Sequence, residues 1–154
     1  MEKSERCLFA GHSVICDSSA EEKIEKYVKF LIINHNVRGF WVGNYGEFDR
    51  CSASVVRKLQ RIYPCIKLEL IVPYLKKEII DYKEQYYKNY NDIIIANIPN
   101  STPKRLSIIK TNEFMVDNSG FLICYIDHGW GGAVKTYEYA KKKGLQIFNI
   151  ADDK

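Results

Sequence analysis

Residues 121–142 read FLICYIDHGWGGAVKTYEYAKK, which is an apolar run, a glycine-rich loop and an amphipathic stretch in that order. The run at 121–125 has the length and composition of a buried strand. In the amphipathic stretch, Val134, Tyr137 and Ala140 recur on one helical face, and Gly144 is a suitable C-terminal cap. A strand, a glycine loop and a helix in this order predict one βα unit of a parallel sheet.

The same alternation extends along the whole chain. Short apolar runs at 7–11, 39–42, 68–72, 92–96 and 146–150 predict five further strands. Apolar residues at helical spacing predict five helices between the strands, the first opened by a capping box of Ser19 and Glu22 and the third lying across 75–86. We therefore expect one α/β domain over residues 1–154, with a Rossmann-like, doubly wound, mostly parallel sheet of about six strands and helices on both faces.

Composition narrows the class of protein. The hydrophobic fraction of 46% and the charged fraction of 27% are those of a globular chain. No apolar run is long enough to span a membrane and no signal region follows Met1, so we expect a cytoplasmic protein without a membrane partner. The five cysteines, Cys16 among them, are odd in number and follow no metal-ligand spacing, which predicts reduced thiols and no metal site.

Charge gives little indication of a nucleic-acid surface. The net charge is +4, and lysines alternate with acidic residues except at 76–77 and 141–143. A nucleic-acid surface usually has a concentrated basic stripe. We therefore interpret these lysines as solvated helix faces and do not expect nucleic acid as a partner.

The loops after the strands should form the functional site, because ligands of open α/β sheets bind beyond the carboxyl ends of the strands. The loops at 43–49 and 127–133 are rich in glycine, and each opens a helix. Unpaired amides and the helix dipole favour an anion such as phosphate at these positions. The loop at 43–49 matches neither the dinucleotide GxGxxG pattern nor a Walker A loop, and steric need at a tight turn is the alternative reason for its glycines.

Several side chains near these loops could contact such a ligand. His12 directly follows the first strand and could donate to a phosphate or ribose oxygen. The same argument applies to His128, but it is weaker there. Asp49 and Glu138 could accept from ligand hydroxyls. Each has an alternative interpretation without a ligand. His12 could pack within its loop, Asp49 could stabilise a helix N-terminus, and Glu138 could be a surface charge. No nucleophile paired with a base can be identified from the spacing.

Five segments together resemble the small proteins of the SLOG superfamily, close to the YpsA-like group. They are FAGH at 9–12, FWVGNYGEFD at 40–49, YPCIKL at 63–68 with VPY at 72–74, Asn112 with MVD at 115–117, and GGA at 131–133 with YA at 139–140. The resemblance covers nearly the whole chain. It implies a Rossmann-like fold related to the DNA-processing protein DprA and to the LOG phosphoribohydrolases, and a nucleotide or nucleotide-derived ligand.

Loop position and resemblance together define a predicted ligand-binding set. It consists of Gly11, His12, Gly43, Asn44, Gly46, Phe48, Asp49, Pro73, Asn112, Gly131, Gly132 and Ala133. The LOG motif PGGxGTxxE is matched at Gly131, Gly132 and Glu138, whereas Val134 and Lys135 replace its Gly-Thr and Thr111 replaces the LOG arginine. A threonine cannot supply bidentate phosphate recognition or stabilise transition-state charge as a guanidinium does.

We therefore expect a module that binds a nucleotide-like small molecule as a sensor, carrier or sequestering protein, with no other cofactor. Two alternatives stay open. One is a nucleoside-monophosphate N-glycosidase in which Glu138 is the catalytic residue. The other is a DprA-like domain that interacts with nucleic acid or protein. The resemblance also leaves open a homodimer or a higher oligomer.

Overall fold

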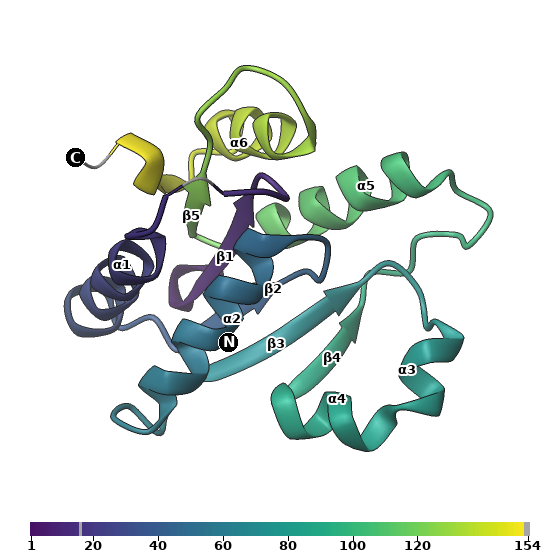
Figure 1. Cartoon of the computed structure of the whole chain (residues 1–154), viewed down its shortest axis with the longest axis horizontal. Helices are drawn as coiled ribbons and strands as arrows, with labels where there is room; N and C mark the ends of the chain where they lie inside the picture. The colour runs from purple at the N-terminus through teal and green to yellow at the C-terminus, as the bar shows by residue number, and fades with distance from the viewer. Residues whose placement is uncertain (16, 153–154) are drawn as a thin grey trace.

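The computed structural model describes residues 1–15 and 17–152, and Figure 1 shows its elements. The strands are β1 (Arg6–Gly11), β2 (Gly39–Val42), β3 (Lys67–Val72), β4 (Asp92–Ile95), β5 (Phe121–Tyr125) and β6 (Gln146–Asn149). The helices are α1 (Ala20–His35), α2 (Glu47–Gln60), α3 (Lys77–Asp81), α4 (Lys83–Asn89), α5 (Lys104–Asp117) and α6 (Gly132–Lys142), with 3-10 turns at Lys3–Glu5 and Ile150–Asp152.

The six strands form one parallel sheet in the order β4-β3-β2-β1-β5-β6. Strand β1 lies in the middle, where Cys7 pairs with Phe40 of β2 on one side and with Phe121 of β5 on the other. The chain builds outward from β1 to β4 and then crosses back to β5 and β6. This order confirms the predicted fold class and puts the reversal between β1 and β5.

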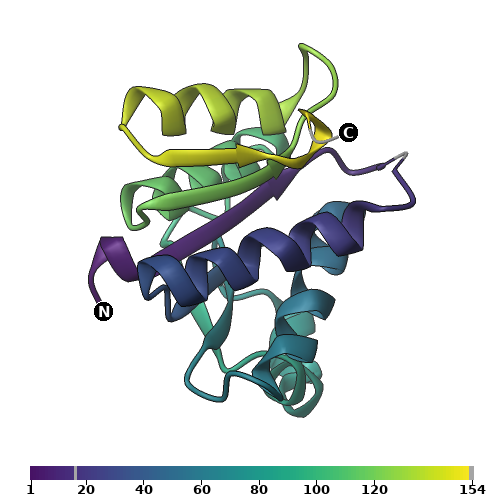
Figure 2. The ribbon, with the colours of Figure 1, turned by 90° about the vertical axis from the view of Figure 1, so that its left-hand side faces the viewer.

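Helices cover both faces of the sheet, as predicted (Figure 2). Alternate residues of β1 point to opposite faces, as in any strand. Phe9 packs with Ile24 and Val28 of α1, whereas Leu8 packs with Met115 of α5 on the other face. Each fully buried side chain of this size contributes about 1.5–3 kcal/mol by leaving water. The two apolar clusters fix the sheet between its helical layers.

The third predicted helix is two short helices instead of one. It divides at Tyr82, whose φ of −115° and ψ of 32° are not helical. Ile79 is the buried residue of α3, and no residue of α4 is buried. The predicted stretch therefore has too little apolar face to hold one continuous helix against the edge of the sheet.

The predicted capping box at the start of α1 is wrong. The Ser19 side chain makes no capping hydrogen bond to the helix, and its Oγ donates to Asp17 Oδ1 at 2.6 Å. Asp17 also accepts from the Ser19 amide at 2.8 Å and from Lys23 Nζ at 2.8 Å. Hydrogen bonds from Lys23 and Ser19 lower the pKa of Asp17 to about 2. Asp17 therefore fixes the turn before α1.

Two further expectations concern membranes and thiols. Within residues 1–15 and 17–152, no helix has the length and apolar character to cross a bilayer. Cys7, Cys51, Cys65 and Cys124 are free thiols, and burial raises the pKa of Cys124 to about 12. Cys16 lies outside the described residues.

Candidate functional site

A cavity of about 670 Å³ opens at the carboxyl ends of the central strands. It lies beside the crossover between β1 and β5, where ligands of open α/β sheets bind. The loops after β1, β2 and β5 and the first turns of α5 and α6 surround it. The residues that line it are Ala10, Gly11, His12, Ser13, Val14, Asn44, Tyr45, Gly46, Asp49, Lys104, Arg105, Ile108, Ile109, Asn112, His128, Trp130, Gly131, Gly132, Ala133 and Lys135.

Most of the predicted ligand-binding residues meet in this cavity. They are Gly11, His12, Asn44, Gly46, Asp49, Asn112, Gly131, Gly132 and Ala133. Segments from three strand ends and from α5 come together here although they are far apart in the sequence. The contact of each residue with a ligand stays a prediction.

Three predicted residues near the cavity have other places in the structure. Phe48, in the first turn of α2, is fully buried in the core. Pro73 is buried, and its carbonyl accepts from the Ile98 amide at 2.8 Å, which joins the ends of β3 and β4. Gly43 is buried, and a Cβ there would lie 3.0 Å from the ring of Tyr45. None of these three residues lines the cavity, and each has a role in packing or in a turn.

The structure also places Glu138 outside the cavity. Glu138 is exposed on α6 and lines a separate hollow together with Glu113 and Lys142. That hollow adjoins the cavity, since Ile109 and Lys135 line both, and a catalytic role of Glu138 stays a prediction.

In the first glycine loop, two backbone amides donate to acceptors within the protein. The Tyr45 amide donates to Asp49 Oδ2 at 3.0 Å, and the Glu47 amide donates to the Ser13 carbonyl at 2.8 Å. Burial raises the pKa of Asp49 to about 6 although the Tyr45 amide counteracts this. Two amides of this loop thus have acceptors within the protein, and anion binding by the loop stays a prediction.

The second glycine loop keeps its amides available. Gly131 precedes α6 with a φ of 103°, which favours glycine, and the amides of Gly132 and Ala133 begin the helix without an intrahelical acceptor. Exposed Lys104, Arg105 and Lys135 also line the cavity. Positive side chains thus surround the positive end of the α6 dipole, an arrangement that favours an anion.

No sequence pattern indicated that Lys104 and Arg105 belong to the site. They lie in the first turn of α5, and no motif links them to the glycine loops. The nearest local signal is Pro103, which can mark a helix start. Crossover geometry brings α5 and α6 together, and Asn112 Nδ2 of α5 donates to Thr136 Oγ1 of α6 at 3.0 Å.

Thr111 occupies the position where LOG enzymes carry their arginine. Its side chain is fully buried and donates to the Ser107 carbonyl at 2.7 Å, within α5. Thr111 is therefore turned inward and does not line the cavity. The guanidinium at the cavity is that of Arg105, in the first turn of the same helix.

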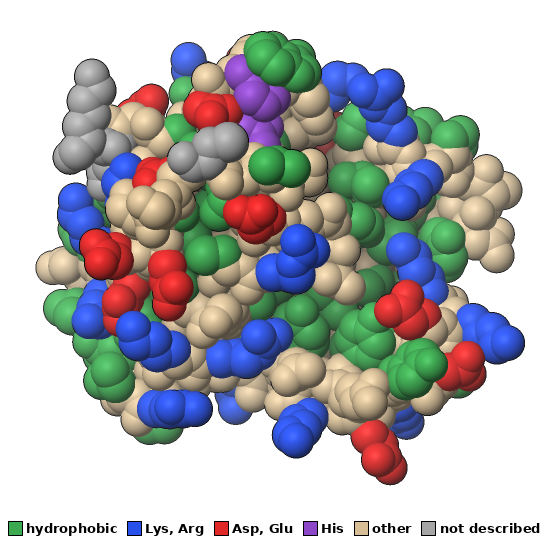
Figure 3. Space-filling model, viewed as in Figure 1, with side chains coloured by type: hydrophobic (Ala, Val, Ile, Leu, Met, Phe, Trp, Pro, Cys, Tyr) green, Lys and Arg blue, Asp and Glu red, His purple; other side chains and the backbone are tan. Residues whose placement is uncertain are grey.

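An aromatic column stands at the edge of the cavity. The His12 and His128 rings are stacked with their centroids 3.5 Å apart, and the His128 and Trp130 rings are stacked at 3.7 Å. Trp130 is 70% exposed, so the face of its indole turned away from His128 is open to a partner. In Figure 3 histidine side chains reach the surface at the upper edge of this view, with Lys or Arg side chains to their right.

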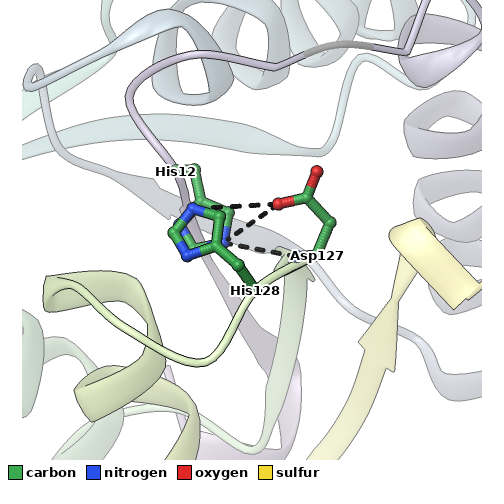
Figure 4. A group of neighbouring side chains, drawn as sticks. All are labelled: His12, Asp127 and His128. Atoms are coloured by element: carbon green, nitrogen blue, oxygen red, sulfur yellow. Dashed lines mark hydrogen bonds and ion pairs between the residues drawn. The ribbon is translucent and has the colours of Figure 1, made fainter.

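His12 and His128 both lie beside Asp127, as Figure 4 shows. The Asp127 amide donates to His12 Nε2 at 3.3 Å, and Asp127 Oδ1 lies 3.5 Å from the same nitrogen. The His128 Nε2 lies 3.8 Å from Asp127 Oδ1. Burial, followed by the effect of His128, lowers the pKa of His12. The surroundings of His12 therefore favour its neutral form, although Asp127 counteracts this.

Comparisons with known proteins identify the fold. No protein-family model matches the chain, and no curated protein matches it. The DNA processing protein A (DprA) from Streptococcus pneumoniae superposes with a TM-score of 0.69 at 14% identity, over 94% of this chain and 49% of that one. DNA processing protein A from Helicobacter pylori, described with a single-stranded DNA binding mode, superposes with a TM-score of 0.68 at 12% identity, over 96% of this chain and 65% of that one.

The chain is therefore a Rossmann-like α/β protein with the fold of a domain found in DprA proteins. It spans about half the length of the first of these structures and less than two thirds of the second. The expectation that nucleic acid is no partner is corrected, because this fold occurs in a protein described as binding single-stranded DNA. Sparse basic charge in the sequence does not exclude a nucleic-acid partner for such a fold.

Proposed function

We propose that the cavity binds a nucleotide or nucleotide-derived ligand. Its phosphate would lie at the N-terminus of α6, and its base would stack on Trp130. The observation that carries this proposal is the meeting of unpaired helix amides, cationic side chains and an exposed indole on one cavity.

Phosphate recognition follows from the positive surroundings of Gly132 and Ala133. Backbone amides at a helix start bind phosphate oxygens directly, and a guanidinium such as that of Arg105 can do so in a bidentate manner. The part-buried Asp49 is the carboxylate among the described residues that line the cavity. The local charge of the cavity therefore favours an anionic ligand.

Base recognition follows from Trp130. An indole exposed to water does not stabilise the fold. Stacking of a base on an aromatic ring contributes about 1–3 kcal/mol to the free energy of binding. The volume of about 670 Å³ falls within the usual range of small-molecule pockets. We favour binding over N-glycosidic cleavage because Glu138 lies outside the cavity.

Calorimetry against AMP, cyclic nucleotides and ADP-ribose tests the proposal. We expect one ligand per chain, and roughly tenfold weaker binding in Arg105→Gln and in Lys135→Gln because each removes a phosphate partner. Lys142→Gln is the matched control, since Lys142 lies at the far end of the same helix. Absence of binding across the panel, or equal weakening by the control, would contradict the proposal.

A single strand of DNA is the second candidate ligand. The fold shared with the Helicobacter pylori protein favours it, and the same cations and the same indole could contact a strand's phosphates and bases. Binding of a labelled oligonucleotide measured against salt distinguishes the two candidates. A strand that contacts several cations must show a steep loss of affinity with salt, whereas a mononucleotide shows a shallow one.

A further inference from the structure

Three side chains with metal-binding atoms meet at the edge of the cavity, from two neighbouring strand ends. His12 directly follows β1, and Asp127 and His128 follow β5 (Figure 4). One nitrogen of each imidazole and one carboxylate oxygen all lie within 4.8 Å of one another. Because β1 and β5 are hydrogen-bonded neighbours, the sheet itself holds the three positions together.

The separations are close to those of ligands around one ion. A zinc ion lies about 2.0–2.2 Å from imidazole nitrogen and carboxylate oxygen, so two of its tetrahedral ligands lie about 3.4 Å apart. Asp127 Oδ1 lies 3.5 Å from His12 Nε2 and 3.8 Å from His128 Nε2. These two separations are thus slightly longer than the distance between two ligands of one ion.

The hydrogen bonding of His12 leaves an electron pair facing the carboxylate. The Asp127 amide donates to His12 Nε2 at 3.3 Å, so this nitrogen has its lone pair toward the loop, and a metal ion would displace this long hydrogen bond. Asp127 Oδ1 lies 3.5 Å from the same nitrogen, with His12 8% exposed and Asp127 43% exposed. A cation bound by both atoms would be attracted to the carboxylate charge and to the imidazole lone pair.

We propose that His12, Asp127 and His128 bind a divalent transition metal ion of the zinc class. Imidazole and carboxylate are ligands that such ions prefer. Three protein ligands leave a fourth position open, and it lies on the side of the cavity because both histidines line the cavity. A water molecule or a phosphate oxygen of the proposed nucleotide can take that position. The proposal goes beyond nucleotide binding and does not depend on it.

Metal binding requires the His128 ring to turn. The two imidazole planes are 10° from parallel, so their lone pairs run side by side and do not converge on one ion. Nothing among the described residues holds His128 Nδ1, which is buried without a hydrogen-bond partner. The rotation would break the stack of His128 on Trp130. Trp130 fluorescence is therefore a readout of metal binding that does not require activity.

The test uses the full chain, without an affinity tag and stripped of metal, titrated with Zn²⁺ and with Co²⁺ in the absence of nucleotide. We expect one ion per chain, a change in tryptophan emission, and Co²⁺ absorption bands of an imidazole and carboxylate site without thiolate charge transfer. Affinity should fall on the order of 10- to 100-fold in His128→Gln and in Asp127→Asn. These side chains are 27% and 43% exposed, so both variants should fold.

The third histidine supplies the matched control. His35 lies at the end of α1, where its ring contacts Phe30 and Phe121. His35→Gln should leave metal affinity unchanged. Absence of metal binding by the wild type, retained affinity in the His128→Gln and Asp127→Asn proteins, a thiolate band with Co²⁺, or equal loss in His35→Gln would overturn the proposal. None of these outcomes bears on nucleotide binding, which the cations of the cavity support separately.

Discussion

The ring of Phe48 occupies the space that a side chain on Gly11 would need: a Cβ at Gly11 would lie 2.5 Å from Phe48 Cγ. Both residues were predicted to contact a ligand; Gly11 lines the cavity, whereas Phe48 packs against Gly11 from the core. Gly11→Ala should therefore destabilise the protein by about 1–3 kcal/mol, the usual cost of overpacking a core. Urea unfolding measures this loss. Gly129→Ala is the control, because nothing lies within 4 Å of a Cβ there.

Gly131 and Gly132 should respond to alanine with opposite signs. Gly131 has a φ of 103°, so an alanine there is strained and should cost about 1–2 kcal/mol. Gly132 is helical with open space around its Cβ, so Gly132→Ala should stabilise by about 0.4–1 kcal/mol. Thermal unfolding of both variants measures the contrast, and equal effects would contradict the loop geometry.

Asp49 should make stability depend on pH in the direction opposite to an ordinary surface carboxylate. Its folded pKa of about 6 exceeds the ordinary 3.8, so the folded state binds the proton more tightly. The resulting stability is fully present below pH 3.8 and is lost as pH rises through about 6, by about 3 kcal/mol in total. Asp49→Asn should remove this dependence because an amide does not titrate. Its oxygen can still accept from the Tyr45 amide, so the loop should keep this hydrogen bond. Unfolding of both proteins between pH 4 and pH 8, on the order of one measurement per pH unit, tests the sign; parallel profiles would refute it.

Asn149 should be required to hold the loop that carries Asp127 and His128. Its Nδ2 donates to the Ile126 carbonyl and its Oδ1 accepts from the Ile126 amide, both at 3.0 Å. Asn149→Ala leaves both backbone groups without these partners and should cost about 1–3 kcal/mol in the free energy of unfolding. Asn34→Ala, which removes an exposed hydrogen bond to Phe30, should change stability by less than about 0.5 kcal/mol. A loss in Asn149→Ala no larger than in the control would disprove this role.

Trp130 should matter for binding and not for stability. Because it is 70% exposed, Trp130→Ala should leave the unfolding free energy within about 0.5 kcal/mol of wild type. Nucleotide affinity should fall roughly tenfold, because base stacking is lost. Tyr87→Ala on α4 removes another exposed ring and should leave affinity unchanged. Calorimetry of the three proteins decides; unchanged affinity in Trp130→Ala would rule out stacking on this ring.

Much of the fold could be predicted because its signals are local. Each strand lies on a short apolar run, and the sheet's parallel order follows from helices that alternate with strands. The prediction of one helix across 75–86 failed at Tyr82 because spacing alone does not show how little of α3 and α4 is covered. Likewise, Asp17 and not a capping box fixes the start of α1, because local hydrogen-bond partners compete for Ser19.

The sequence by itself determined the layered parallel sheet and the meeting of the loops after β1, β2 and β5, because periodicity and strand direction are properties of neighbouring residues. Only the tertiary structure decided which side chains face the cavity. Phe48 and Asp49 are adjacent, but successive helical side chains point about 100° apart, so one enters the core and the other lines the cavity. Arg105 and His128 reach the same cavity from different elements. Their meeting could not be predicted because local spacing does not encode how elements pack across a crossover.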